Sequence, residues 1–473
     1  MRLLLAFLLL SATLPGSLPA QAPAMGVDPR VELLAIIFRL AGNPEYSQGL
    51  VPAYDRAIAE HFAPWREHEA VKLAAEFRER RGVSFDGVMS MAIHLSDAER
   101  LEERVPFDAP EGSLDRRWGG AEARRFVAAA RRFVVEARYA EFRAAQRALY
   151  DTTDARLTRL LATGVDYAWF NRFFGAPPGG RFVLVPGLAN GGGSFGPRVV
   201  FPDGTEELYA IVGVSQVDST GLPRFTEGMI GTVVHEFNHS YVNPVVTAQA
   251  TRFTAAGRQI YEAVTAEMRG QAYGNWKTMV DESLVRASVV RYLEARGGAE
   301  MARRAAIGEE ARGFYWTTEL AALLGEYEAA RDGYPDLASF LPRVAEFFTA
   351  LAPRVDSLRA AFNARRPRLV GISPDTTGGV DPAVTELVLI FDRPMAPGYS
   401  FNPVPGARGV VVPLVGASWD DSHTRLTLRL SLEPATDYAV RLNAPIGGNF
   451  RSADGVPLAA TPVLFRTRGP GGD

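Results

Sequence analysis

The sequence predicts a multidomain protein in which a mainly helical α+β domain precedes an all-β sandwich. Three observations lead to this prediction. Between about residues 27 and 161, apolar side chains recur with the spacing of helices. Two short β-rich runs follow, and helical patterns resume from 245 to 365. From 366 to 473, short alternating segments are separated by Pro and Gly clusters, which is typical of a sandwich of about 100 residues.

The composition is that of a globular chain without disulfides. Of 473 residues, 47% are hydrophobic and 22% are charged, which suits two or three domains. The net charge of −3 gives no indication of a nucleic-acid or anionic-membrane partner. Because the chain has no cysteine, any metal site must use His, Asp and Glu.

The first twenty residues, MRLLLAFLLLSATLPGSLPA, have the pattern of a secretory signal peptide. We expect cleavage after Ala20. The apolar run from Leu3 to Leu10 is too short to span a bilayer. The sequence therefore predicts a periplasmic or secreted protein with no membrane insertion after cleavage, and a first domain over residues 21–365.

The N-terminal part of that domain is expected to be helical. VELLAIIFRLAG, residues 31–42, predicts a helix that ends at Gly42. The run from Ala121 to Tyr150 predicts one long amphipathic helix with an arginine-rich, solvated outer face. Two strands, 182–188 and 208–217, are then expected to form a β ribbon within residues 180–217, joined by a flexible glycine-rich loop, ANGGGSFGPR. That loop lacks the Gly-Lys-Ser/Thr ending of a phosphate loop.

The segment GTVVHEFNHS lies on a predicted helix with two chemically different faces. Thr226 is the expected N-cap and Pro244 the expected end. At about 100° per residue, His235 and His239 share one face with two glycines, and Glu236 lies at its flank. The opposite face is apolar and is made by Met229, Ile230, Val233, Val234, Phe237 and Tyr241.

This spacing is typical of a zinc site. Two imidazoles one helical turn apart can bind the same ion, and Glu236 can take a proton from a metal-bound water as general base. The alternative is a pair of exposed histidines on the wet side of an amphipathic helix. The full His-Glu-x-x-His pattern in a chain with only six histidines favours the Zn²⁺ site.

A catalytic zinc needs a third protein ligand. The helix that begins at Trp276 places Glu282 on a face with Val285, Val289 and Leu293, and a carboxylate on an apolar face needs a partner. A metal or an ion pair with Arg286 would supply one. Asp281, Glu262 and Glu267 remain alternative ligands. The candidates for stabilising an oxyanion are Tyr315, Tyr273, Asn243 and His94.

The order of strands, HEFNH helix and downstream glutamate resembles the gluzincin metallopeptidases. VDPRVELLAIIFRLAGNPEY, HEFNHSYVNP and DESLVRA more closely resemble the bacterial domain family DUF4932, over about residues 27–360. The resemblance implies a zincin-like fold, with His235, His239 and Glu282 as zinc ligands and Glu236 as general base. The best-known gluzincins carry an Asn before the third glutamate, where this chain has Asp281.

The C-terminal segment 366–473 is similar to bacterial Ig-like domains of the SbsA type. PDTTGGVDPAVTELVLIFDRPM, LEPATDYAVRL and FRT carry the similarity. It implies a spacer or adhesion module, and with it contact with the cell envelope.

Together these features predict an exported zinc metallopeptidase that acts on a peptide or protein substrate. An extended substrate could add as a strand along 182–188 or 208–217. The alternative is an exported, envelope-associated binding protein whose zinc site is structural or vestigial.

Overall fold

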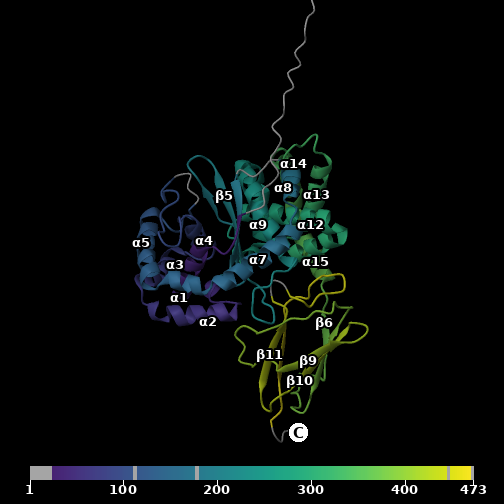
Figure 1. Ribbon diagram of the computed structural model, residues 1–473. Coiled ribbons are helices and arrows are strands. Elements are labelled where there is room, and N and C mark those ends of the chain that lie inside the picture. The colour runs from purple at the N-terminus through teal and green to yellow at the C-terminus, as the bar shows by residue number, and fades with distance from the viewer. Residues whose placement is uncertain (1–23, 110–113, 176–179, 445–447, 470–473) are drawn as a thin grey trace, which may run out of the picture. The chain divides into compact units, whose positions relative to one another are not determined.

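The computed structural model describes residues 24–109, 114–175, 180–444 and 448–469 (Figure 1). The expected signal peptide lies outside the described residues. The chain divides into two compact units, Met1–Val245 with Tyr334–Leu337, and Val246–Gly333 with Ala338–Asp473. Within the described helices, none is long and apolar enough to cross a membrane.

The helices of the first unit surround α1, a helix buried on all sides. Every residue from Val31 to Phe38 is buried, and Asp28 caps the helix by accepting a hydrogen bond from the Arg30 amide. The expected end at Gly42 is confirmed, since α1 stops at Leu40 and Gly42 has a φ of 88°. The helices and 3₁₀ turns are α1 (Pro29–Leu40), η1 (Pro44–Tyr46), α2 (Pro52–Phe62), η2 (Ala63–Trp65), α3 (Glu69–Arg81), α4 (Asp86–Ile93), α5 (Gly120–Glu136), α6 (Tyr139–Ala145), α7 (Arg147–Gly164) and α8 (Tyr167–Phe174).

The prediction of one helix from Ala121 to Tyr150 is wrong. The chain breaks between α5 and α6 at Arg138, which takes a left-handed conformation with φ 50°. The break lets aromatic rings from both helices, Phe133 and Phe142, pack on Phe62 at centroid distances of 5.8 and 4.8 Å. The burial of these rings outweighs the local cost of the left-handed residue.

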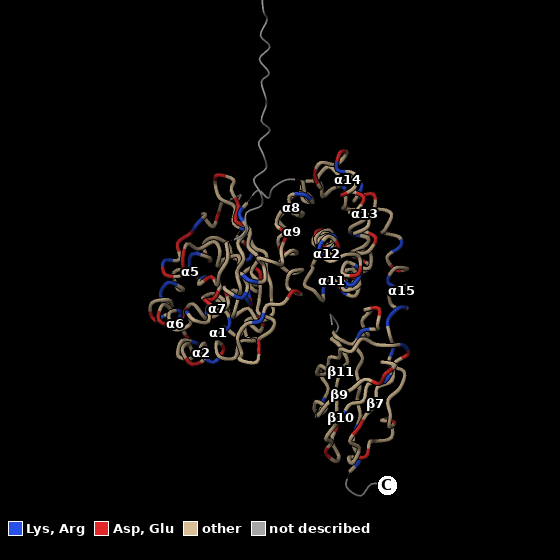
Figure 2. The backbone as a smooth tube through the Cα atoms, turned by 45° about the vertical axis from the view of Figure 1, so that its right-hand side comes forward, with Lys and Arg blue, Asp and Glu red and all other residues tan. Residues whose placement is uncertain are grey.

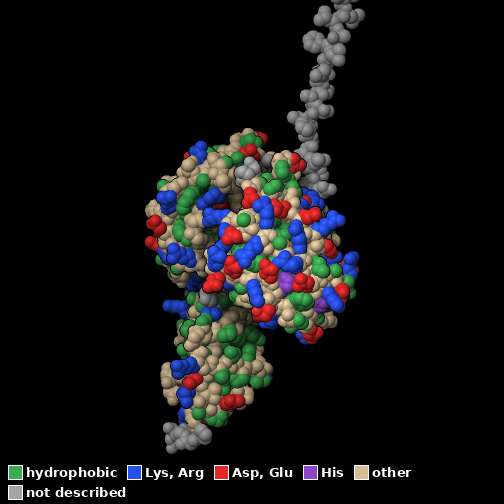
Figure 3. Space-filling model, turned by 90° about the vertical axis from the view of Figure 1, so that its left-hand side faces the viewer, with side chains coloured by type: hydrophobic (Ala, Val, Ile, Leu, Met, Phe, Trp, Pro, Cys, Tyr) green, Lys and Arg blue, Asp and Glu red, His purple; other side chains and the backbone are tan. Residues whose placement is uncertain are grey.

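The arginine-rich outer face of α5 is solvated, as expected. Its arginines pair with acidic side chains of neighbouring segments: Arg124 with Glu103, and Arg132 with Glu69. Figure 2 shows basic and acidic residues interspersed along the backbone, and Figure 3 shows them mixed on one face of the molecule. Neither view shows a large region of a single charge sign, which agrees with the small net charge.

The sheet of the first unit differs from the expected ribbon. The strands β2 (Gly180–Gly187) and β5 (Glu206–Gly213) do pair, but in parallel, and β1 (Ala24–Met25) adds in parallel to β2. The glycine-rich segment between them is not a plain loop. It supplies β3 (Ser194–Phe195) and β4 (Arg198–Val200), which pair with β5 in antiparallel fashion.

This topology narrows the expected substrate edge. The strand β5 lies between β2 and the pair β3 and β4 and is therefore interior, whereas β1 pairs with β2 only at Val183 and Leu184. A peptide cannot add to a strand whose two backbone edges are already hydrogen-bonded. The edge that remains beside β5 is formed by β3 and β4.

The helix that carries the two histidines, α9, spans Gly228–Ala248, and the second unit continues with helices packed around α12. The long α12 bends at Gly298, and it packs against α10 and α13. The elements are η3 (Ala250–Phe253), α10 (Thr254–Ala263), α11 (Thr265–Arg269), α12 (Trp276–Glu310), α13 (Thr317–Ala329), α14 (Leu337–Leu351), η4 (Ala352–Arg354) and α15 (Val355–Arg365).

The C-terminal part is made of two antiparallel sheets that share one apolar core. One sheet has the order β6 (Leu369–Ser373), β7 (Glu386–Phe391), β10 (Arg425–Leu430) and β9 (Leu414–Trp419); the other has β12 (Thr461–Arg466), β11 (Asp437–Leu442) and β8 (Phe401–Asn402). The alternating segments TELVLIFD, TRLTLRLS, DYAVRLN and PVLFRTR predict four strands, and they form β7, β10, β11 and β12. The strands β6, β8 and β9 were not predicted.

Candidate metal centre

The helix α9 has the two faces that its sequence predicts. Met229, Ile230, Val233, Val234, Phe237 and Tyr241 are all buried. His235 and His239 are only partly buried, and Gly228 is exposed. The apolar face packs on aromatic rings of α8 and β2; Phe182, for example, lies 4.2 Å from Phe237 between ring centroids. This packing fixes the helix that presents the two imidazoles.

The expected end of α9 at Pro244 is wrong, because the helix continues to Ala248. Proline removes only one amide donor, and its own side chain is exposed. Val242 and Val246 on either side are fully buried, and their burial holds the last turn in place.

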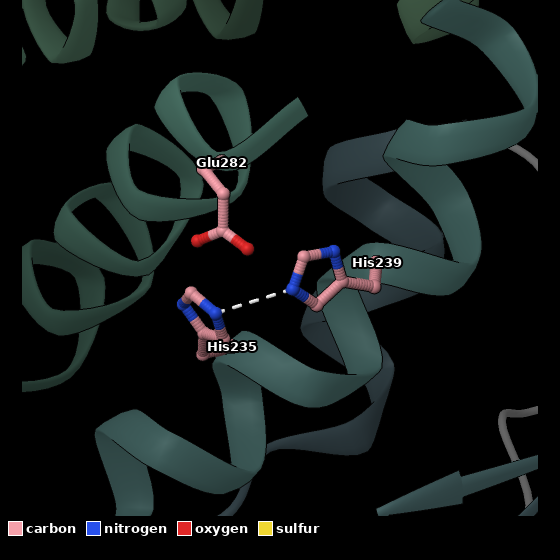
Figure 4. Close-up of side chains that lie close together, drawn as sticks. All are labelled: His235, His239 and Glu282. Carbon is pink, nitrogen blue, oxygen red and sulfur yellow. Dashed lines mark hydrogen bonds between the residues drawn. The ribbon is translucent and has the colours of Figure 1, made fainter. Parts of the chain in front are cut away.

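The imidazoles of His235 and His239 converge on one point. Their Nε2 atoms lie 3.2 Å apart (Figure 4). Two nitrogens bound to one tetrahedral zinc, each about 2.0–2.1 Å from the ion, would lie about 3.3 Å apart. Imidazole nitrogens at this separation either share a proton or share a cation, and the spacing fits a shared zinc.

Asn243, one turn beyond His239, fixes the orientation of that imidazole. The Asn243 Oδ1 lies 3.2 Å from His239 Nδ1. An amide oxygen can only accept, so the contact favours the tautomer in which Nδ1 carries the proton and donates it. The Nε2 lone pair then faces His235, which is the arrangement a metal ligand requires.

The third member of the group is Glu282 of α12. His235, His239 and Glu282 each offer a ligand atom, and these atoms all lie within 4.8 Å of one another. Figure 4 shows the carboxylate pointing toward the two imidazoles. Within the described part of the chain, this is the one group of three or more His, Asp or Glu side chains with that spacing. The two nitrogens and one oxygen are a donor set that suits zinc.

The alternative ligands have other environments. Asp281 is buried but forms an ion pair with Lys277 at 2.8 Å. Glu262 is exposed. Glu267 accepts a hydrogen bond from the Tyr315 hydroxyl at 3.1 Å and lies 3.6 Å from Arg359. None of the three belongs to the group formed with the histidines.

The carboxylate of Glu282 lies in a buried polar cluster. Glu282 is 6% exposed, and Arg286, at 5%, lies 3.1 Å from one of its oxygens. The same guanidinium donates to the Tyr273 hydroxyl at 2.9 Å and pairs with Glu309. Burial first, and then the Glu282 charge, raise the pKa of the Tyr273 hydroxyl above its ordinary value, so the hydroxyl stays protonated. The expected ion pair with Arg286 therefore exists alongside the three-residue group.

The side chain of Glu236 lies against the edge of the sheet. A Cβ atom added to Gly196, between β3 and β4, would stand 2.7 Å from Glu236 Oε2. Any larger residue at this position would therefore make the Glu236 carboxylate shift. The sequence does not by itself single out Gly196, which stands just before Pro197 in a glycine-rich segment.

The four candidates for an oxyanion stabiliser separate into two kinds. Asn243 and Tyr273 lie next to proposed ligands, whereas Tyr315 bonds to Glu267 and His94 lies in the core of the first unit. The Nδ1 of His94 lies 2.7 Å from the Ser90 carbonyl oxygen. Burial, which is the largest influence, lowers the pKa of His94 to about 4, so this side chain is neutral and structural.

The comparison with protein families gives one match. The model described as "Domain of unknown function (DUF4932)" matches residues 24–347. No curated protein and no solved structure is detectably similar to the chain.

Proposed function

The chain belongs to the DUF4932 family, and we propose that it is an exported zinc-dependent metallohydrolase that cleaves peptide bonds. One observation carries the proposal: the ligand atoms of His235, His239 and Glu282 lie within 4.8 Å of one another, with Glu236 on the same helix as the histidines. These are the residues whose pattern resembles the gluzincins, and a zincin-like fold is part of the proposal.

Each residue has a distinct role in this proposal. His235 and His239 would hold zinc through Nε2 and Glu282 through one carboxylate oxygen, which leaves a fourth position for water or substrate. When bound, zinc lowers the pKa of the water it holds to about 7 and polarises the substrate carbonyl. Glu236 takes the proton of the attacking water and passes it to the leaving amine. Asn243 keeps His239 in the required tautomer.

A peptide is the substrate class that suits the neighbouring edge. The strands β3 and β4 run antiparallel to β5, and Gly196 between them lies against Glu236. An extended chain can hydrogen-bond to such an edge as an added strand, which would bring a backbone carbonyl near the general base. Side chains that flank the edge would then select among peptides.

The other parts of the chain fit an exported enzyme. We infer that residues 1–20 are a signal peptide and that the two-sheet C-terminal part is an Ig-like module that contacts the cell envelope. The antiparallel sheets and their shared core support the second inference. Mass spectrometry of the secreted protein's N-terminus would test the first, with cleavage after Ala20 as the expected result.

The proposed activity is tested by metal analysis and one substitution. We expect about one zinc per chain, cleavage of peptides from a library that stops with chelator, and a loss of about 10³-fold or more in kcat for Glu236→Gln with zinc retained. The exposed Glu262→Gln is the matched control and should cleave at the parent rate. Absence of bound metal, or an unchanged rate in Glu236→Gln, would overturn the proposal.

The same purified protein decides between an enzyme and a binding protein with a structural site. A cobalt-substituted protein with a water-accessible fourth position would shift its visible spectrum when a hydroxamate is added. If the spectrum instead indicates four protein ligands and does not change when the hydroxamate is added, the structural site is favoured.

A further inference from the structure

We propose that Arg286 is a positioning residue for the metal centre, which holds the Glu282 carboxylate in its ligating orientation. The inference rests on the proposed function, because it takes Glu282 as the third zinc ligand. The proposed catalytic mechanism gives the buried guanidinium of Arg286 no role, and the positioning of Glu282 supplies one.

The contacts of Arg286 fix its guanidinium in place. Its side chain is 6% exposed, and the guanidinium carbon lies 4.6 Å from the centre of the buried Phe314 ring. One terminal nitrogen pairs with Glu309, and the other lies between Glu282, at 3.1 Å, and the Tyr273 hydroxyl, at 2.9 Å. Because the planar guanidinium contacts three polar side chains and one aromatic ring, it has little freedom to move.

This placement gives the Glu282 carboxylate a charged partner beside the two imidazoles. Arg286 lies 3.1 Å from Oε2, and Glu282 also points toward His235 and His239 (Figure 4). A glutamate has three side-chain torsions, so an unheld carboxylate would sample several orientations before it met a metal. The ion pair with the guanidinium restricts these torsions, so the carboxylate already points toward the imidazoles before the metal arrives.

The charge balance also requires Arg286. The carboxylates of Glu282 and Glu309 converge on one region, and Glu282 is buried. Two carboxylates there without a cation would repel each other and be poorly solvated. Arg286 neutralises part of this charge, so the ligand geometry can persist without metal, and zinc then binds to a preformed site.

The chain offers a matched control for this role. Arg291 lies on the same helix α12 and also bridges two carboxylates, Glu294 and Glu328. Neither of them belongs to the group formed with His235 and His239. Arg291→Gln therefore removes the same side chain and the same kind of double ion pair away from the ligands.

The test measures zinc affinity by competition with a chelator in the full chain. We expect Arg286→Gln to weaken zinc binding about 10- to 100-fold, the usual effect of removing a partner of a ligand, and Arg291→Gln to change it less than about twofold. Arg286→Lys keeps the charge without the planar fork, so it should lose at least about tenfold. The cobalt spectrum should change in both Arg286 variants and not in Arg291→Gln.

The outcomes separate this inference from the proposed function. If the parent binds no zinc, both are overturned. If the parent binds zinc and cleaves peptides, but Arg286→Gln and Arg286→Lys bind zinc within about twofold of the parent, only the positioning role is overturned. If Arg286→Gln does not fold, the zinc affinities of Arg286→Lys and Tyr273→Phe test the positioning role instead. The latter removes the hydroxyl beside Glu282 and keeps the ring, and it should weaken zinc binding about three- to tenfold.

Discussion

A buried carboxylate in the first unit makes stability depend on pH near neutrality. Glu32, on α1, is completely buried. Its oxygens accept hydrogen bonds from the Tyr54 hydroxyl at 2.8 Å and from the amides of Leu188 and Ala189 at 2.7 and 3.2 Å. Burial is the largest influence and outweighs these bonds, so the pKa of Glu32 rises from 4.5 to about 7.

The sign and size of the effect follow from the two pKa values. Below about pH 4.5 the carboxyl is protonated in the folded and unfolded chain alike, and its stability contribution is fully present. As pH rises toward 7, the unfolded chain ionises first, so the free energy of unfolding falls. At about 1.4 kcal/mol for each pH unit, the rise from 4.5 to about 7 corresponds to a loss of about 3 kcal/mol, complete above pH 7.

The substitution Glu32→Gln removes the titration while keeping the shape of the side chain. The quantity to measure is the difference in unfolding free energy between the parent and Glu32→Gln, from urea unfolding followed by circular dichroism at several pH values from about 5 to 8. Taking the difference at each pH cancels the other titrating groups. We expect the parent to lose about 2–3 kcal/mol relative to the variant over this range.

A second buried carboxylate provides a control of opposite sign. Burial alone would raise the pKa of Glu45, but its hydrogen bonds to Arg78 lower it below the ordinary value. Its stability contribution is present above pH 4.5 and is lost as pH falls, so Glu45→Gln should differ from the parent most at neutral pH. A parent-minus-Glu32→Gln difference that stays constant within about 1 kcal/mol from pH 5 to 8 would refute the argument for Glu32.

Three further predictions address the metal centre and the C-terminal part. Gly196→Ala should keep zinc but lose about 10- to 100-fold in kcat, because its Cβ would displace the Glu236 carboxylate; zinc content and rate check it. Asn243→Ala should weaken zinc binding about tenfold, measured by chelator competition, since it frees His239. Leu426→Ala, in the core of the two sheets, should destabilise that part by about 2–4 kcal/mol in urea unfolding while zinc affinity stays at the parent value.

The parts of the fold that the sequence predicted are those with long, regular patterns. The two faces of α9 follow from apolar residues spaced over three turns, and burial of those residues confirms them. Glu282 was singled out because a carboxylate on an apolar helix face needs a partner. The two faces of α9 and the apolar face that carries Glu282 are both set by residues close in sequence.

The errors share a physical cause, which is that distant contacts override local signals. Nothing near Arg138 signals a break, since the break is stabilised by rings that pack on Phe62, far away in the chain. The strands β3 and β4 have two and three residues and are set by their pairing with β5. A pattern of period two cannot be seen in segments this short.

The choice between Asp281 and Glu282 as the third ligand depends on a contact with another helix, which local sequence does not show. In KTMVDESLVR each carboxylate has a cation one helical turn away, Lys277 for Asp281 and Arg286 for Glu282, and both ion pairs form. The ion pairs within the helix therefore do not distinguish Asp281 from Glu282 as the metal ligand. Adjacent helical positions point about 100° apart, so only one of them can face a given neighbour. The group with His235 and His239 contains Glu282, and the consequence is that Arg286, not Lys277, is the cation whose removal should change zinc affinity.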